Sequence, residues 1–358
     1  MCSSIRKRKF CAVVLIVQNR TPLHIYPTTT RPVDITMKTH LSLASIAVAA
    51  AVLLLAACQS DRSVQSESGL SPGQGFIDVP GGKVWYRIVG SGDATPLLVL
   101  HGGPGAPHYY LKPLAALSDE RPVVFYDQLG AGRSVSESDT SLWRIDRFVE
   151  ELAQVRAALG LDEVHILGQS WGTILALEYM MTNPEGVHSI IMSSPAIDIA
   201  RWLADADSLV TTLPDSLQSV IATAEAAGTF DDPAYQEAVM SFYTRYLARK
   251  LPWSADLDSS FAQFNLDLYG YMWGPSEFTA TGTLKEYNGT DKLAKLDVPV
   301  LFVAGRYDEA TPATVAFYQS QVPGSELAIL EESAHLTMQD EPEENVRIVR
   351  DFLNGVEK

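Results

Sequence analysis

Short apolar runs rich in β-branched residues recur along the chain from residue 83 to residue 330. They predict seven strands, at 83–89, 96–100, 122–126, 164–167, 187–192, 299–303 and 326–330. Amphipathic segments separate several of these runs. The clearest is 142–159, where apolar residues from Ile145 to Leu159 keep the three-and-four spacing of one helical face. Strands that alternate with helices indicate an α/β fold with a mostly parallel sheet, covered by helices on both faces.

The alternation stops between residues 195 and 283 and resumes at residue 298, before a last helix near 343–353. The interrupted segment has helical patterning, few strand-like runs and many aromatic residues, so we interpret it as a helical cap inserted into the fold. The core is therefore expected at 76–194 and 284–358, with the cap at 195–283. Aromatic residues of the cap that could line an apolar pocket are Trp253, Phe261, Phe264, Tyr269, Tyr271 and Trp273.

The N-terminal segment has the pattern of a targeting sequence. After Met37 and a basic Lys38, an apolar run at 41–57 ends at Cys58 and is shorter than the ~20 residues that span a bilayer. Its end, Leu55-Ala56-Ala57-Cys58, resembles the lipobox of bacterial lipoproteins, which implies cleavage before Cys58 and acylation of its sulfur. An uncleaved anchor or an ordinary secretory signal is the alternative.

We therefore expect residues 1–57 to be removed, with Met37 as the start, and residues 58–75, rich in Ser, Gln and Gly, to form a flexible tether. The resemblance implies an extracytoplasmic protein held on a bacterial membrane by a lipid on Cys58. Because Gln59 is not an aspartate, that membrane would be the outer membrane in a Gram-negative host.

Composition excludes several classes of protein. The 358 residues are 46% hydrophobic and 20% charged, which is typical of a packed globular protein rather than a disordered one. The formal charge of −16 argues against a nucleic-acid partner. The three cysteines, Cys2, Cys11 and Cys58, leave residues 59–358 without a thiol for catalysis, disulfides or zinc.

A candidate nucleophile lies between a predicted strand and a predicted helix. Gly168-Gln169-Ser170-Trp171-Gly172 directly follows the run at 164–167, which is the setting of a nucleophile elbow. Glycines allow the tight turn that lifts the serine oxygen above the sheet. The sequence therefore predicts Ser170 as the nucleophile of a serine hydrolase.

A serine nucleophile needs a base, which in this fold follows an acid late in the chain. Only His188 and His335 follow Ser170, and His188 comes too early for an acid to precede it. We therefore predict His335 as the base. Asp308, after the run at 299–303, is the predicted acid that orients the ring, and Asp198, after the run at 187–192, is the alternative.

A second glycine-rich loop suits an oxyanion hole. His101-Gly102-Gly103-Pro104-Gly105 ends the predicted strand at 96–100, where loops of this fold supply a backbone N–H group. The residue after the nucleophile supplies the other. We therefore predict the N–H groups of Gly103 and Trp171 as the two oxyanion donors. No metal or organic cofactor is needed for this chemistry.

With these motifs the chain resembles the proline iminopeptidases, a serine-peptidase branch of the α/β-hydrolases, over about residues 75–355. The resemblance also rests on Tyr126-Asp127-Gln128 with the following Gly130, Gly132, Arg133 and Ser134. Segments 273–278, 305–309 and 333–338 are similar to the tricorn-interacting aminopeptidase and its bacterial relatives. The elbow differs, since many prolyl enzymes have Gly-Gly-Ser-Trp-Gly there.

The resemblance implies a function. In such enzymes carboxylates bind the free α-ammonium group of the substrate, and Glu277 and Glu309 match their positions. It implies an exopeptidase that releases an N-terminal residue, proline or another, from short peptides or amino-acid amides through an acyl-enzyme. The alternatives are an amidase, esterase or lactonase of the same fold that needs no free amine, or a surface binding protein built on a degenerate hydrolase.

Overall fold

The computed structural model describes residues 70–137 and 139–358. The lipobox, Cys58 and the first part of the expected tether lie outside these residues. Within the described ranges, no helix combines the length and the apolar character needed to cross a membrane.

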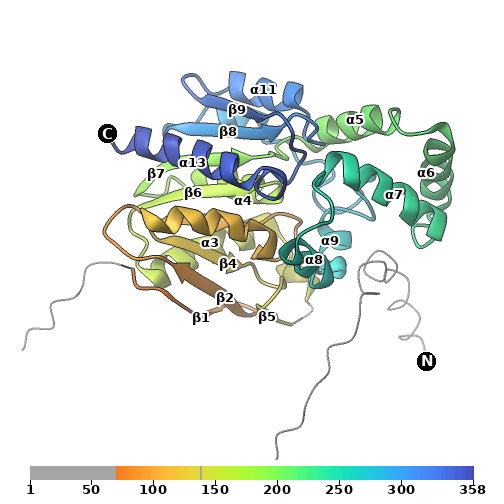
Figure 1. The fold of residues 1–358 in the computed structure, drawn as a ribbon. Helices are drawn as coiled ribbons and strands as arrows, with labels where there is room; N and C mark the ends of the chain where they lie inside the picture. The colour runs from red at the N-terminus through yellow and green to blue at the C-terminus, as the bar shows by residue number, and fades with distance from the viewer. Residues whose placement is uncertain (1–69, 138) are drawn as a thin grey trace, which may run out of the picture. The chain divides into compact units, whose positions relative to one another are not determined.

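A sheet of nine strands forms the centre of the described chain (Figure 1). Its order is β1-β2-β4-β3-β6-β7-β8-β9, and the short β5 pairs with β2. β1, β2, β4 and β5 meet in antiparallel pairs, and every other pairing is parallel. The strands are β1 (Gly73–Val79), β2 (Gly82–Val89), β3 (Leu97–Leu100), β4 (Val123–Asp127), β5 (Val135–Ser136), β6 (Val164–Gln169), β7 (Val187–Ser193), β8 (Val300–Gly305) and β9 (Glu326–Leu330).

All seven predicted strands overlap observed strands, and the prediction of a mostly parallel α/β sheet is confirmed. Two strands were not predicted. β1 starts at Gly73, inside the segment expected to be a tether, and Leu70 already forms a bridge with Gly92. β1 is an edge strand that contains two glycines and exposes Phe76, so it lacks the apolar run that marks the buried strands. β5 has only two residues.

Helices cover both faces of the sheet. α3 (Ile145–Leu159), α4 (Trp171–Met180) and α11 (Pro312–Ser320) pack on one face, and the 3-10 helix η4 (His108–Asp119) and α13 (Pro342–Val356) pack on the other. β3 contributes to both cores, because Leu98 and Leu100 join the first and Leu97 and Val99 join the second. Short helices complete the core: η5 (Thr140–Leu142), α10 (Thr290–Leu293) and α12 (Thr337–Asp340).

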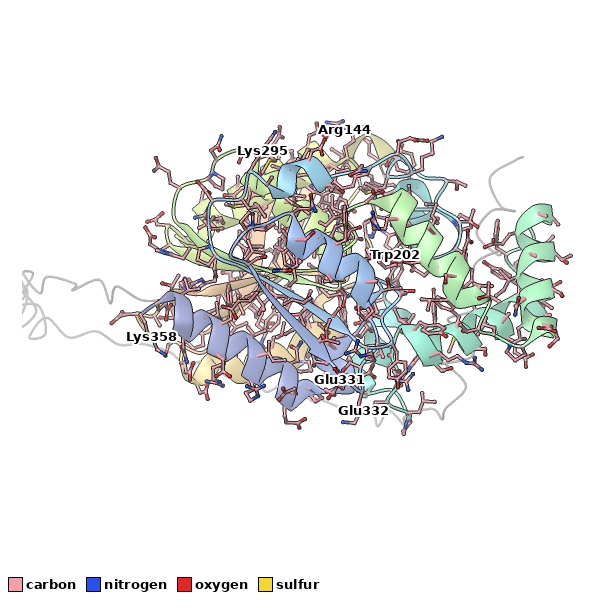
Figure 2. The ribbon with its side chains drawn as sticks, turned by 90° about the horizontal axis from the view of Figure 1, so that it is seen from above. Arg144, Trp202, Lys295, Glu331, Glu332 and Lys358 are labelled. Atoms are coloured by element: carbon pink, nitrogen blue, oxygen red, sulfur yellow. The ribbon has the colours of Figure 1, made fainter. Side chains whose placement is uncertain are left out.

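Five helices follow β7 inside the segment where the cap was expected: α5 (Ile199–Val210), α6 (Asp215–Ala227), α7 (Pro233–Tyr246), α8 (Ala255–Ala262) and α9 (Leu266–Met272). In Figure 1, α5, α6 and α7 extend past one end of the sheet. α6 and α7 have an apolar cluster of their own, which includes Ile221 and Phe242. Trp202 of α5, labelled in Figure 2, joins cap and core, since its ring lies 5.4 Å from those of Trp273 and His335.

Candidate active site

Ser170 lies at the sharp turn between β6 and α4. Its backbone has φ 55° and ψ −122°, a conformation that is rare for a residue with a Cβ. The turn requires its two glycines, because a Cβ on Gly168 would collide with the carbonyl of Gly172, and a Cβ on Gly172 with that of Leu100. The turn therefore carries the serine on a strained, tightly packed support, as a nucleophile elbow does.

His335 and Asp308 come together on the loops after β9 and β8. The His335 Nδ1 lies 2.8 Å from the Asp308 Oδ1, and both side chains are buried. The same carboxyl oxygen accepts the backbone N–H of Ala310 at 2.8 Å, which fixes its orientation. A carboxylate partner places the proton on Nδ1, so the His335 Nε2 is left as the proton acceptor.

The alternative acid, Asp198, and the excluded base, His188, both lie elsewhere. Asp198 caps α5 by accepting the N–H groups of Ala200 and Arg201, and its other carboxyl oxygen accepts the amide of Asn288. It therefore serves as a helix cap rather than as the partner of His335. His188, the second residue of β7, forms an exposed pair with Glu163.

Gly103, in the loop after β3, lines the cavity that contains Ser170. The carbonyl of Gly102, in the same peptide unit, is engaged by the N–H of Ala106 at 3.3 Å. Trp171 is the first residue of α4, where an N–H group has no acceptor within the helix. In the described chain no hydrogen bond occupies the N–H of Gly103 or of Trp171. Both groups are therefore free to bind an oxyanion.

His101 and Gln128 support this loop. The backbone N–H of Gln128 donates to the His101 Nε2 at 2.9 Å, so the ring proton lies on Nδ1, 3.0 Å from the Gly102 carbonyl. Burial lowers the pKa of His101 to about 4, which keeps the ring neutral. The Gln128 side chain also donates to the His101 carbonyl and accepts the indole N–H of Trp171, linking the loop to the elbow.

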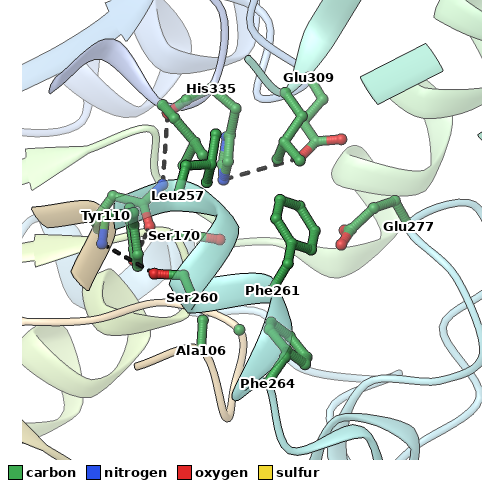
Figure 3. A pocket seen from close by; sticks show the side chains of 14 residues that line it. Ala106, Tyr110, Ser170, Leu257, Ser260, Phe261, Phe264, Glu277, Glu309 and His335 are labelled. Atoms are coloured by element: carbon green, nitrogen blue, oxygen red, sulfur yellow. Dashed lines mark hydrogen bonds and ion pairs between the residues drawn. The ribbon is translucent and has the colours of Figure 1, made fainter. Parts of the chain in front are cut away.

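Two carboxylates share the cavity with Ser170 and His335 (Figure 3). Glu309 is buried, its Oε1 lies 3.9 Å from the His335 Nε2, and its Oε2 has no hydrogen-bond partner in the described chain. Glu277, from the cap, accepts the hydroxyl of Tyr269 at 2.6 Å. No lysine or arginine of the described residues pairs with either one.

Burial raises the pKa of Glu309 well above its usual range, and the negative charges of Glu277 and Asp308 raise it further. Burial also raises the pKa of Glu277, although the Tyr269 hydrogen bond acts in the opposite direction. Both carboxylates would be stabilised by a cation in the cavity, because opposite charge offsets the lost hydration.

Apolar side chains complete the cavity, whose volume is about 70 Å³. Phe261 and Phe264, two of the six cap aromatics singled out in the sequence, line it. With Glu277 they also line a neighbouring cavity of about 100 Å³ inside the cap, where Tyr269 lies. The others have different roles: Trp253 stacks on Phe261, Trp273 is buried, and Tyr271 is exposed.

Known proteins resemble this chain over most of its length. Residues 95–342 match the family described as alpha/beta hydrolase fold. The proline iminopeptidase of Heyndrickxia coagulans is 46% identical over 287 residues, which cover 79% of this chain and 99% of that protein. This chain belongs to the proline iminopeptidase family.

Two further relatives support the membership. The proline iminopeptidase of Clostridium botulinum is 35% identical over 78% of this chain and 98% of its own length. The crystal structure of a proline iminopeptidase from Mycobacterium smegmatis superimposes with a TM-score of 0.74 at 34% identity, covering 79% of this chain and 98% of that one.

The structure adds residues that the sequence patterns did not reveal. Tyr110 and Gln169 line the cavity and are hydrogen-bonded to each other, and the rings of Trp202 and His335 pack in a T-shaped arrangement. The sequence shows Gln169 only as a departure from the Gly-Gly-Ser-Trp-Gly elbow of many prolyl enzymes and gives no sign of its role. Tyr110 and Trp202 had no such signal, because their roles depend on contacts between segments far apart in the chain.

Proposed function

We propose that this protein is a serine exopeptidase that releases an N-terminal residue, proline above all, from short peptides or amino-acid amides. The feature that carries the proposal is the Glu309 carboxylate, buried without a hydrogen bond to Oε2, beside Glu277 in the cavity of Ser170. A substrate α-ammonium group would provide the missing positive charge and hold the first residue with its carbonyl at Ser170. The names of the relatives agree with this choice of substrate.

The chemistry follows from the arrangement of the donors and acceptors. The Ser170 Oγ attacks the carbonyl carbon while the His335 Nε2 takes its proton, and Asp308 stabilises the resulting imidazolium. The carbonyl oxygen becomes an oxyanion that accepts the N–H groups of Gly103 and Trp171. The C–N bond then breaks, and His335 gives its proton to the departing amine.

An ester between Ser170 and the first residue remains. A water molecule attacks this ester while His335 takes one of its protons, and a second tetrahedral oxyanion forms in the same hole. Its collapse releases the free amino acid and returns the proton to the Ser170 oxygen. Peptide and water are thereby converted to an amino acid and a shortened peptide.

Paired substrates test this activity. The purified protein is given p-nitroanilides of proline, alanine and leucine and the same compounds N-acetylated, with Ser170→Ala as the blank. Cleavage of only the free-amine compounds is expected, and the rates rank the preference for the first residue. Equal cleavage of the acetylated compounds, or activity on simple esters alone, would contradict the exopeptidase and favour the amidase or esterase.

We also propose that the protein is extracytoplasmic and is held on a bacterial membrane by a lipid on Cys58. The support is the sequence Leu55-Ala56-Ala57-Cys58 after an apolar run. About a fifth of this chain lies outside the alignment with the Heyndrickxia coagulans protein, although that protein is covered almost completely.

Labelling with a radioactive fatty acid tests the anchor. Label is expected in the wild type and in the control Ser63→Ala, which lies in the segment expected to remain after cleavage, and it should be lost in Cys58→Ala. Label that persists in Cys58→Ala would exclude this attachment site.

A further inference from the structure

The hydroxyl of Tyr110 connects the oxyanion loop to the nucleophile elbow. Tyr110 is buried in η4, and its oxygen accepts the backbone N–H of Gly102 at 2.7 Å and donates to the Gln169 Oε1 at 2.6 Å. The backbone N–H can only donate, so the tyrosine proton must lie toward Gln169. Burial raises the pKa of Tyr110 above its usual range, so the proton stays on the hydroxyl oxygen.

The two residues that Tyr110 joins adjoin the reacting groups. Gly102 precedes Gly103, one proposed oxyanion donor, and Gln169 precedes Ser170, which is followed by the other donor, Trp171. The contact is close, because a Cβ on Gly102 would lie 2.6 Å from the Gln169 Oε1 and 3.0 Å from the Ser170 Cβ. Any rotation of either segment would therefore change the distance between the two donors.

The bond from Gly102 also selects which N–H group is free. The Gly102 N–H is held by Tyr110 and the Gly102 carbonyl by Ala106, whereas the N–H of Gly103, which lines the cavity, has no partner among the described residues. Without the Tyr110 hydroxyl, Gly102 would have an unsatisfied buried donor that could be relieved only by moving the loop. Such a movement of the loop would impair catalysis, because oxyanion donors act through their preorganised position.

We propose that Tyr110 and Gln169 are positioning residues that set the spacing of the oxyanion hole. This inference rests on the proposed acyl transfer at Ser170. The pair touches neither the carbonyl nor the leaving group in the reaction described above. Its effect should therefore fall on the transition state, which carries the oxyanion, and spare the binding of the substrate.

Tyr110→Phe tests this role by removing one oxygen atom. Tyr109→Phe is the matched control, since the neighbouring Tyr109 donates to Gln263 at the surface. Active sites are titrated so that rates refer to folded enzyme. We expect Tyr110→Phe to lower kcat about tenfold to a hundredfold with KM within about twofold, below the ~10²–10³ lost with a whole oxyanion donor. Tyr109→Phe should stay within twofold of wild type.

A transition-state probe separates positioning from general loss of stability. Prolinal is the aldehyde that corresponds to proline, and the Ser170 oxygen attacks its carbonyl carbon to form a tetrahedral adduct. Proline binds without forming such an adduct. The affinity for prolinal should fall by the factor seen in kcat, and the affinity for proline should not change. Equal weakening of both ligands, or an unchanged kcat, would overturn the proposal.

Gln169→Leu provides a second, independent variant. It should lose at least as much kcat as Tyr110→Phe, because it also removes the bond from the Gln169 Nε2 to the His335 carbonyl at 3.5 Å. The double variant should lose little more than Gln169→Leu alone, because both changes break the same Tyr110–Gln169 hydrogen bond. Additive losses would overturn the proposal, and this variant carries the test if Tyr110→Phe does not fold. All rates are also measured with p-nitrophenyl acetate, whose cleavage needs the oxyanion hole but no amine. Cleavage of the ester alone would contradict the proposed exopeptidase activity. The ester rates of the variants would still test the role of the Tyr110–Gln169 hydrogen bond.

Discussion

Replacing Glu309 by glutamine should damage recognition of a free amine and leave the acyl-transfer chemistry at Ser170 nearly unchanged. The substitution keeps the size of the side chain and removes its charge from a cavity that no lysine or arginine of the described residues lines. Opposite unit charges ~4 Å apart attract by about 4 kcal/mol at an effective dielectric constant of ~20. Part of this is offset, because the raised pKa of Glu309 means that a proton must leave before the cation binds. The net loss should be about 2 kcal/mol, or about 30-fold in kcat/KM.

The assay compares two substrates. Proline p-nitroanilide carries the ammonium group and should show the full loss, whereas p-nitrophenyl acetate lacks it and should change less than about threefold. The exposed Glu286, replaced by glutamine, is the matched control and should leave both rates unchanged. Equal losses on the two substrates would refute a role for Glu309 in binding the amine.

The same variant should be more stable than the wild type. A carboxyl group whose pKa is raised by folding holds its proton more tightly in the folded state, so it destabilises the fold as pH rises above the unfolded value of ~4.3. Glu309→Gln removes this cost. The gain in Tm should be absent near pH 4 and grow toward pH 8, and a gain that shrinks with rising pH would contradict the burial argument.

Three further outcomes are expected. The KM of proline p-nitroanilide should rise as pH falls, because protonation of Glu277 and Glu309 removes the charge that binds the ammonium group. A KM that depends on pH no more than the KM of p-nitrophenyl acetate does would contradict this. Asp308→Asn should lower kcat about 10⁴-fold by favouring the wrong His335 tautomer, whereas Asp198→Asn should leave kcat within twofold; similar kcat values for the two variants would contradict the assignment. Gly172→Ala should lower Tm and kcat together, as its methyl group would collide with the Leu100 carbonyl, and a variant with wild-type Tm would show that the elbow can relax.

The core strands and the elbow could be predicted because each has a local signal. Buried parallel strands are continuous apolar runs, and the glycines around Ser170 lie where the chain must turn sharply and pack closely. Edge strand β1 has no such run, since one of its faces is solvated and two of its residues are glycines.

The environment of the site could be predicted only in part. The order of Ser170, Asp308 and His335 along the chain is readable, but a carboxylate in a cap loop is not distinctive, and Glu277 was found through the family resemblance alone. The Tyr110–Gln169 bridge joins residues 59 positions apart, and no periodic pattern reports such a hydrogen bond.

The central claim is that the cavity accepts a free N-terminus and that Ser170 cuts the bond next to it. Mass spectrometry of a digest tests this most directly, with a synthetic peptide that begins with proline and the same peptide N-acetylated. We expect stepwise loss of single residues from the N-terminus of the free peptide, no cleavage of the acetylated one, and neither reaction with Ser170→Ala. Cleavage of the acetylated peptide, or a first cut at an internal bond, would contradict the account.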